Sequence, residues 1–467
     1  MDSRQARVSS CVITAILSLA VSRLAQAQPV ANAQDLPPNY QTSLRADRWN
    51  EDWDWTSGHD NPPPLKSFSF AGGDIRANLG ADMLVRYEAK DPFNFGVTPE
   101  GDLGLLLARG LVHANVRIGN DVRVFAELGI WDQNGREDGN IFDAADLALQ
   151  RAFIDYKVSD NVQLRLGRQD IFDRSSRLLR AADALNYQQV FDGVNFQLTT
   201  PDSTTQVYLV EPFLPQDGYF ERFDGFGDAL WSGISHQRKS TAIKGLSYGI
   251  YGLWQDRNRA AYLRLPGHDR RATIIGRATL KTDRTRTSVE LGQQIGKVGN
   301  TDIEAWAFAT DASLALGESR DWQIGFRLDG ASGNRATTSE DETWAIVFPA
   351  MFYLGRSGTY QPTNAIGFFP EVSWKINPKV TLSVTGEEVW RTTSDSAFAT
   401  PGGAPLLASG APGNNHILAG GTFEMRWTPS TAHELRAKFF RLQPKGAFQQ
   451  AGGASLKGIT INLISRF

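Results

Sequence analysis

Apolar and polar side chains alternate along most of the chain after about Ile75. The stretch "RDWQIGFRLDG" places Trp322, Ile324 and Phe326 on one side and Arg327 on the other. The stretches "KVTLSVTGEEVW" and "TFEMRW" alternate in the same way. A period of two is typical of β-strands with one apolar and one polar face. The pattern therefore predicts an all-β protein.

The connectors between these segments decide which all-β architecture to expect. The segments number about eighteen, and most reach the ~9–11 residues of a tilted membrane-crossing strand. Short turns alternate with long loops; the turns lie near 119–121, 159–161, 200–203 and 377–379, and the loops near 132–146, 172–187, 213–229, 256–269, 332–363 and 392–415. One connector, near 296–300, is short where a long one is expected. This parity predicts a single transmembrane antiparallel β-barrel over residues 67–467, with short periplasmic turns and long extracellular loops.

Both ends of the chain favour the bacterial outer membrane. Residues 1–27 have a basic start, an apolar core and a small-residue cleavage site, which predicts a signal peptide. Residues 28–66 are rich in Pro and Trp, and we expect an irregular N-terminal periplasmic segment there. The chain ends on the alternating strand "LKGITINLISRF", and an amphipathic last strand closing on Phe467 looks like the signal read by the barrel assembly machinery.

Composition narrows the class of function. The formal net charge of −3 has no dominant sign, which argues against a nucleic-acid partner. Mean hydropathy is −0.32 and no later stretch holds 18 consecutive apolar residues, which argues against a helical membrane protein. The single cysteine, Cys11, falls in the expected signal peptide. Catalytic motifs and metal-ligand spacing are not recognisable, and we expect no enzyme, no cofactor and no metal.

The polar faces of the strands carry both signs of charge. Such a wall either produces a transverse electric field with no strong preference between anions and cations, or consists of arginines held in place by carboxylates. For one arginine the plain alternative is an ion pair between neighbouring strands. The segment "VQLRLGRQDIFDRSSRLL" is unusually cationic, and its loop either folds into the lumen or lies on the cell surface against lipopolysaccharide phosphates. The residues expected on the solute path are Arg151, Arg165, Arg168, Gln169, Arg177, Arg180, Asp192, Arg327 and Arg391.

Three stretches give the chain its resemblance to a known family. They are "RADRWNEDWDW" with the following "PPPLK", "LQRAFIDYKVSDNVQLRLGRQDIFDRSSRLL" with the following "FDGVNFQL", and "VWRTTSDSAFATPGGAP". Together they resemble the alginate export family, whose members are eighteen-stranded outer-membrane porins. The resemblance lends weight to Arg168, Gln169, Asp192 and Arg391, and to either Arg177 or Arg180 as the loop arginine.

These observations predict a monomeric outer-membrane porin for passive diffusion of anionic solutes, including alginate-like or uronate oligosaccharides. Its expected partners are outer-membrane lipid and lipopolysaccharide, an anionic small molecule or polysaccharide, and the barrel assembly machinery. Two alternatives remain open at this point. One is a barrel plugged by its own loops with a scaffold or enzymatic role, and the other is a secreted soluble β-protein.

Overall fold

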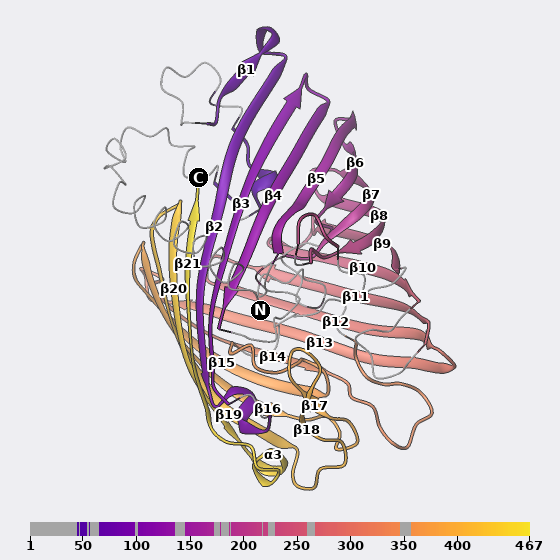
Figure 1. The fold of residues 1–467 in the computed structure, drawn as a ribbon, viewed down its shortest axis with the longest axis vertical. Helices are drawn as coiled ribbons and strands as arrows, with labels where there is room; N and C mark the ends of the chain where they lie inside the picture. The colour runs from indigo at the N-terminus through magenta and orange to yellow at the C-terminus, as the bar shows by residue number, and fades with distance from the viewer. Residues whose placement is uncertain are drawn as a thin grey trace.

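A computed structural model describes residues 44–45, 47–53, 56, 65–98, 101–135, 145–171, 178, 186, 188–216, 218–222, 229–258, 267–345 and 356–467. The expected signal peptide lies outside these residues. Strands dominate the described chain, and they tilt around a common axis to form a barrel wall (Figure 1). No helix among the described residues is long and apolar enough to cross a membrane.

One antiparallel sheet contains the barrel. Its strands are β2 (Ile75–Asp91), β3 (Leu103–Ile118), β4 (Val122–Asn134), β5 (Ala145–Ser159), β6 (Val162–Gln169), β7 (Val190–Thr199), β8 (Ser203–Phe213), β9 (Ala229–Lys239), β10 (Leu246–Arg257), β11 (Asp269–Lys281), β12 (Thr285–Val298), β13 (Thr301–Leu316), β14 (Trp322–Ala331), β15 (Ala365–Asn377), β16 (Val380–Trp390), β19 (His416–Ser430), β20 (His433–Pro444) and β21 (Leu456–Arg466). Each pairs with its sequence neighbours in the sheet, and β2 pairs with β21, which closes the ring. This closed barrel of eighteen strands confirms the predicted fold class.

Small elements complete the described chain. They are η1 (Arg48–Asn50), β1 (Phe68–Phe70), η3 (Ala71–Gly73), η4 (Phe93–Gly96), the two-stranded piece formed by β17 (Phe398–Ala399) and β18 (Pro405–Leu407), and α3 (Gly446–Gln450). Strand β1 extends the sheet by pairing with β2 alone. In Figure 1 the end of β21 lies at the upper rim, while α3, β17 and β18 lie at the lower rim. The lower rim carries the long connectors and is therefore the extracellular one.

The unusual connector near residue 299 is short in the structure as well. Strand β12 ends at Val298 and β13 begins at Thr301, although this turn lies at the extracellular rim. The loop after β14 contacts the strand beside this short turn. The backbone oxygen of Asp341 accepts a hydrogen bond from the N–H of Glu304, and the N–H of Asp341 donates to the backbone oxygen of Asp302. Short β-hairpin turns join strands at the opposite rim, as the sequence predicted.

The outer face of the barrel is apolar. On β14 the exposed apolar residues are Trp322, Ile324, Phe326 and Leu328, which share the side that the alternation predicted. Trp322 stacks on Trp374 of β15 with ring centroids 5.1 Å apart near the periplasmic rim. Lipid offers no hydrogen-bond partner to a free sheet edge, and the closed ring leaves no such edge. Lipid also requires an apolar surface, which the outward side chains provide. These features exclude the soluble β-protein alternative.

Candidate functional site

Strand register separates lumenal from lipid-facing side chains. On β5 and β6 the side chains of Ile154 and Leu166 are 49% and 48% exposed and point outward. Asp155 and Arg165 have the opposite parity and are register partners, as are Arg165 and Asn195 of β7. Since side chains alternate across a strand, these polar residues face the lumen.

Two arginines share one carboxylate on this inner wall. Arg165 donates from Nε to Asp155 Oδ1 at 2.6 Å and from Nη2 to Oδ2 at 3.0 Å. Arg123 of β4 donates to the same Oδ2 at 2.5 Å. Phe153 lies beneath both guanidinium groups, with the Arg165 group 4.0 Å from the ring centroid. One negative charge against two positive charges leaves a local cationic excess, and the ring fixes its position.

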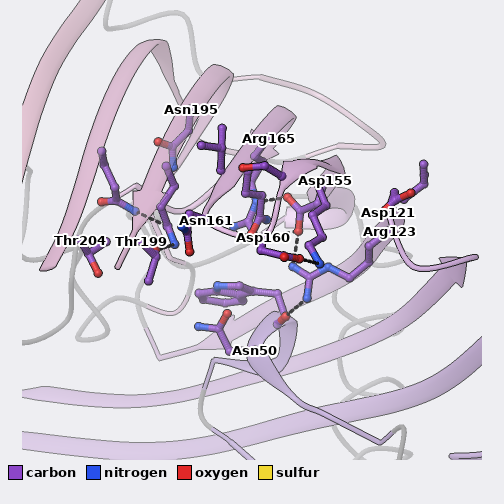
Figure 2. Close-up of a pocket in the computed structure, with 18 of the residues that line it drawn as sticks. Asn50, Asp121, Arg123, Asp155, Asp160, Asn161, Arg165, Asn195, Thr199 and Thr204 are labelled. Carbon is purple, nitrogen blue, oxygen red and sulfur yellow. Dashed lines mark hydrogen bonds and ion pairs between the residues drawn. The ribbon is translucent and has the colours of Figure 1, made fainter. Parts of the chain in front are cut away.

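This cluster lines a cavity of about 950 Å³ at the periplasmic end of the barrel (Figure 2). The cavity wall is formed mainly by strand ends and the short turns after β3, β5 and β7. Its cationic lining residues are Arg76, Arg117, Arg123, Lys157 and Arg165, its acidic ones are Asp47, Asp121, Asp155, Asp160 and Asp170, and carboxamides and hydroxyls fill much of the remainder, including Asn50, Asn161, Asn195, Gln163, Gln197, Gln206, Thr199 and Thr204. Such a lining offers many reversible hydrogen bonds to a hydrated solute.

An N-terminal arm, residues 44–53, forms one side of the cavity. Trp49 of η1 packs with Phe125 and Phe153 of the inner wall, and its backbone oxygen accepts a 2.7 Å hydrogen bond from Arg123. Figure 2 shows Asn50, the next residue along the arm, below the Arg165 and Asp155 pair. The sequence placed residues 28–66 in the periplasm as an irregular segment. Trp49 and its neighbours in this segment contact the inner wall at the periplasmic end of the barrel.

Cationic side chains anchor the arm and the residues after it. Arg48 forms a buried ion pair with Glu51 at 2.8 Å, and burial raises the pKa of Glu51. Lys66 donates from Nζ to the backbone oxygens of Leu79 at 2.7 Å and Phe467 at 3.1 Å. Burial lowers the pKa of Lys66 to about 8. The Lys66 contacts tie the residues after the arm to the first barrel strand and to the C-terminal residue that follows the last strand.

Arg151 is a buried hub rather than a water-exposed wall residue. Its side chain is 1% exposed and donates to Asp170 at 2.5 Å, to Gln188 at 2.5 Å and to Glu127. Its guanidinium lies 4.3 Å from the centre of the Trp49 indole. Arg151 therefore connects two barrel strands, the loop after β6 and the N-terminal arm. The mixed charges of the inner wall were interpreted either as a transverse field or as arginines held by carboxylates. Arg151 fits the second interpretation.

Arg168 and Asp192 pair on the other face of the sheet. Arg168 donates to both carboxylate oxygens of Asp192 at 2.7 and 2.8 Å, and it stacks on Phe213 at 3.2 Å. Their register is that of outward-facing Leu166. The expectation that this pair lines the lumen is corrected by this register, because the inward parity belongs to Arg165. Sequence spacing missed the parity because Gly-Arg-Gln was interpreted as one motif rather than as alternating faces.

The remaining predicted path residues have varied placements. Gln169 is fully buried and donates to the backbone oxygens of Gly167 and Gly193 at 3.2 and 3.1 Å. Arg327 faces inward, contacts Asp329 at 3.3 Å and lies over Phe369. Arg391 is buried at the extracellular end and donates to Asn415 Oδ1 and to the Gly413 oxygen. Arg177 and Arg180 lie outside the described residues.

Extracellular loops also enter the barrel. Leu178, from the loop after β6, is fully buried, and its N–H donates to Glu290 of β12 at 3.1 Å. Gly292 leaves space there, since a Cβ at this position would lie 3.1 Å from Leu178 and 2.9 Å from Trp344. Trp344 is also fully buried. Two extracellular loops thus meet against the β12 wall and narrow the passage.

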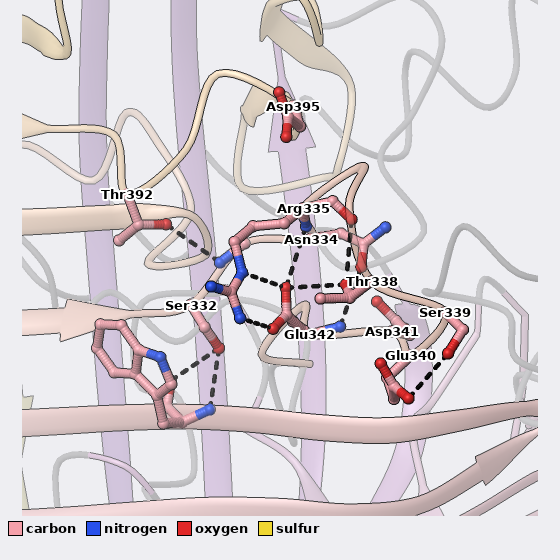
Figure 3. A network of polar contacts seen from close by, with 12 residues as sticks. Ser332, Asn334, Arg335, Thr338, Ser339, Glu340, Asp341, Glu342, Thr392 and Asp395 are labelled. Carbon is pink, nitrogen blue, oxygen red and sulfur yellow. Dashed lines mark hydrogen bonds and ion pairs between the residues drawn. The ribbon is translucent and has the colours of Figure 1, made fainter.

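A polar network secures the second of these loops at the rim (Figure 3). Arg335 donates from Nε to Glu342 Oε2 at 2.8 Å, and Thr338 donates to the same oxygen at 3.2 Å. The hydrogen bond from Arg335 is the largest cause that lowers the pKa of the Glu342 carboxyl. The N–H of Ala336 donates to Asp395 of the loop after β16 at 2.9 Å. This network fixes the direction in which the chain turns toward Trp344.

The described side chains offer no grouping of three or more His, Cys, Asp or Glu residues suited to a metal ion. The site residues absent from the predicted solute path are Arg48, Trp49 and Lys66 in the N-terminal segment and Arg123 on β4. The sequence marks the first three, because Arg48 and Trp49 belong to the Trp-rich "RWNEDW" stretch and Lys66 ends the "PPPLK" stretch, but neither stretch by itself indicates a place inside the barrel.

Comparisons with known proteins agree with this architecture. The family model described as alginate export matches residues 75–460. Among solved structures, OpdK of Pseudomonas aeruginosa with vanillate has 10% identity and a TM-score of 0.56, covering 83% of this chain and 98% of that one. OccK2 (OpdF) of P. aeruginosa with glucuronate has 10% identity and a TM-score of 0.54, covering 84% and 96%. A BenF-like porin of Pseudomonas fluorescens Pf-5 has 10% identity and a TM-score of 0.59, covering 84% and 98%. Curated protein sequences give no match.

Proposed function

The chain belongs to the alginate export family, and we propose that this outer-membrane porin passes anionic solutes by passive diffusion, with uronate oligosaccharides as the substrate class. The observation that carries the proposal is the pair Arg123 and Arg165, which together face a single carboxylate at the periplasmic cavity. A solute carboxylate entering there meets two guanidinium groups that are already oriented.

The acidic residues of the cavity limit how tightly such a solute is held. Asp155 occupies part of the donor capacity of both arginines, and the neighbouring cavity acids repel a long-lived anion. Conduction requires attraction without trapping, and a balanced wall provides both. Two fold relatives were solved with carboxylate solutes, vanillate and glucuronate, which is the same ligand chemistry.

Block of single-channel current by galacturonate oligomers tests the proposal. We expect these oligomers to interrupt current from the periplasmic side in wild type, and we expect Arg165→Ala to weaken the block about tenfold, the effect of losing ~1.4 kcal/mol of charge-assisted hydrogen bonding. Arg168→Ala is the matched control, because it removes an arginine three residues further along the same strand, on the outer face. Equal block in wild type and Arg165→Ala contradicts the proposed anion path.

A loop-plugged barrel with a scaffold role is the second candidate. The contact between Leu178 and Glu290 and the burial of Trp344 favour it, because both place loop residues inside the barrel. Single-channel recording distinguishes the two candidates. A porin gives unitary current steps, whereas a scaffold plugged by its loops gives none.

A further inference from the structure

Two cations face each other on the outside of the barrel near its extracellular rim. Arg441 of β20 and Lys457 of β21 are register partners, and both are exposed. They share parity with Phe439, which is 48% exposed to the lipid side. Both side chains therefore point away from the lumen, just beyond the apolar band.

This arrangement is costly without a third group. Like charges directly opposite each other on neighbouring strands destabilise a sheet. Within the described part of the chain, no carboxylate oxygen lies within 4.0 Å of the charged nitrogens of either residue. Asp91 is the register partner of Lys457 on β2, but these two residues form no ion pair at that distance.

Several other outward charges at this rim have partners. Arg168 pairs with Asp192, Lys297 contacts Asp302 at 3.0 Å, and His416 contacts Glu388 at 2.7 Å. Lys297 also stands opposite a cation, Arg270, but Asp302 neutralises it. The pair formed by Arg441 and Lys457 differs in having two positive charges side by side and no carboxylate contact within the described part of the chain. A bound anion is the simplest group that removes the repulsion.

The surface beside the pair lacks side chains on two neighbouring strands. In register with Arg441 lie Gly421 of β19 and then Gly386 of β16, neither of which carries a side chain. Exposed Phe423 and Phe439 lie one row deeper toward the membrane centre. The patch thus combines two cations at the rim, two glycines beside them and two exposed phenylalanines nearer the membrane centre. A lipid with an anionic head and several acyl chains has this distribution of charge.

We propose that Arg441 and Lys457 bind a phosphate group of the outer-leaflet glycolipid, lipid A. The Arg441 guanidinium suits two phosphate oxygens at once, and the Lys457 ammonium adds a point charge to the same group. Lys445 directly follows the end of β20, with Nζ donating to Gln443 Oε1 at 3.2 Å, and its charge adds to the field at this rim. The acyl chains of the bound lipid cover Gly421, Phe423 and Phe439.

Titration of the purified, detergent-solubilised protein with lipid A, followed by native mass spectrometry, tests this site. Bisphosphorylated lipid A should bind wild type, and the double variant Arg441→Gln/Lys457→Gln should lower its affinity about tenfold or more, the loss expected for charge-assisted hydrogen bonds to phosphate. Lys297→Gln is the control, since it alters an outward lysine at the same rim that already has a carboxylate partner. Dephosphorylated lipid A should bind wild type and the double variant equally.

Thermal stability in lipid-free detergent separates binding from a structural role. Because the two cations repel each other, Arg441→Gln should leave the unfolding temperature unchanged or raise it. Addition of bisphosphorylated lipid A should stabilise wild type more than this variant. Undiminished lipid A affinity in the double variant, or a loss of stability on Arg441→Gln before lipid is added, overturns the proposal.

Discussion

The guanidinium of Arg48 donates a 2.6 Å hydrogen bond from Nη2 to the backbone oxygen of Phe467. The same group donates from Nη1 to the backbone oxygen of Ala81 at 3.3 Å. Ala81 belongs to the first barrel strand and Phe467 follows the last. One side chain of the N-terminal arm therefore bridges the seam at which the barrel closes, and Lys66 bridges it a second time.

Substitution of Arg48 should weaken this seam. Arg48→Ala removes both hydrogen bonds and leaves buried Glu51 without its ion-pair partner, which costs on the order of 3–5 kcal/mol of local stability. We expect a lower temperature for the shift from folded to unfolded barrel in SDS gels. Arg48→Ala/Glu51→Gln should recover part of the loss. Arg45→Ala is the control, because Arg45 contacts Glu51 through its backbone N–H. A transition temperature for Arg48→Ala equal to that of the control would refute the bridging role.

Gly80 should be needed for docking of the arm. A Cβ on Gly80 would lie 2.4 Å from His113 Cε1 and 2.8 Å from Arg48 Nη2. Gly80→Ala should therefore displace Arg48 at a cost of about 1–3 kcal/mol, as overpacking of a filled site does. Hydrogen exchange of residues 48–53 should accelerate in this variant. Gly276→Ala, where a Cβ meets no atom within 4 Å, should leave that exchange unchanged. Unchanged exchange in both variants would show that the arm tolerates the added methyl group.

Arg151 should be far more important for stability than an ordinary ion-paired arginine. Arg151→Met leaves Glu127 and Asp170 buried without their cation, which should cost about 3–5 kcal/mol. The comparison is Arg426→Met, which removes a half-exposed guanidinium from buried Glu434 and leaves Glu434 its second partner, Arg436, so the loss should be less than ~1 kcal/mol. Urea unfolding in detergent micelles measures both variants. Similar losses would mean that the hub contributes no more than a surface pair.

The docking of the arm should depend on alkaline pH through Lys66. The docked lysine has a pKa of about 8 instead of 10.5, so between these values a released arm holds a proton that the docked arm has given up. Docking therefore strengthens as pH rises from 8 to 10.5 and is weakest below 8, with a total change on the order of 3 kcal/mol. Protection factors of residues 48–53, corrected for intrinsic exchange, measure it. Lys66→Met should dock more weakly and show no such rise; a rise of equal size in this variant would assign it to other groups.

The outward half of the fold was predictable because a period of two fixes which side chains share a face. Residues such as Trp322, Ile324 and Phe326 are sorted by the bilayer alone, so alternation identifies them without any tertiary information. The closed ring and the parity of turns and loops follow from the same solvent argument. Even the short connector after Val298 was visible in the spacing of strands.

The inner site was less predictable because its contacts join distant segments. Trp49 contacts Phe153 and Arg151 only after the arm folds back into the barrel. The local sequence around Trp49 does not predict these long-range contacts. Arg168 shows a different failure. Its motif was conspicuous, but one residue of register decides between lumen and lipid, and the parity assigned Arg165 to the lumen instead.

Reversal potentials of single channels in a salt gradient test the central claim most directly. With a potassium chloride gradient across a planar bilayer, we predict a chloride-to-potassium permeability ratio above one for wild type. The ratio should fall in Arg165→Ala and stay unchanged in Arg168→Ala, which differ in the face of the sheet from which the charge is removed. A cation-selective wild-type channel, or a ratio that changes with Arg168 and not with Arg165, contradicts the account.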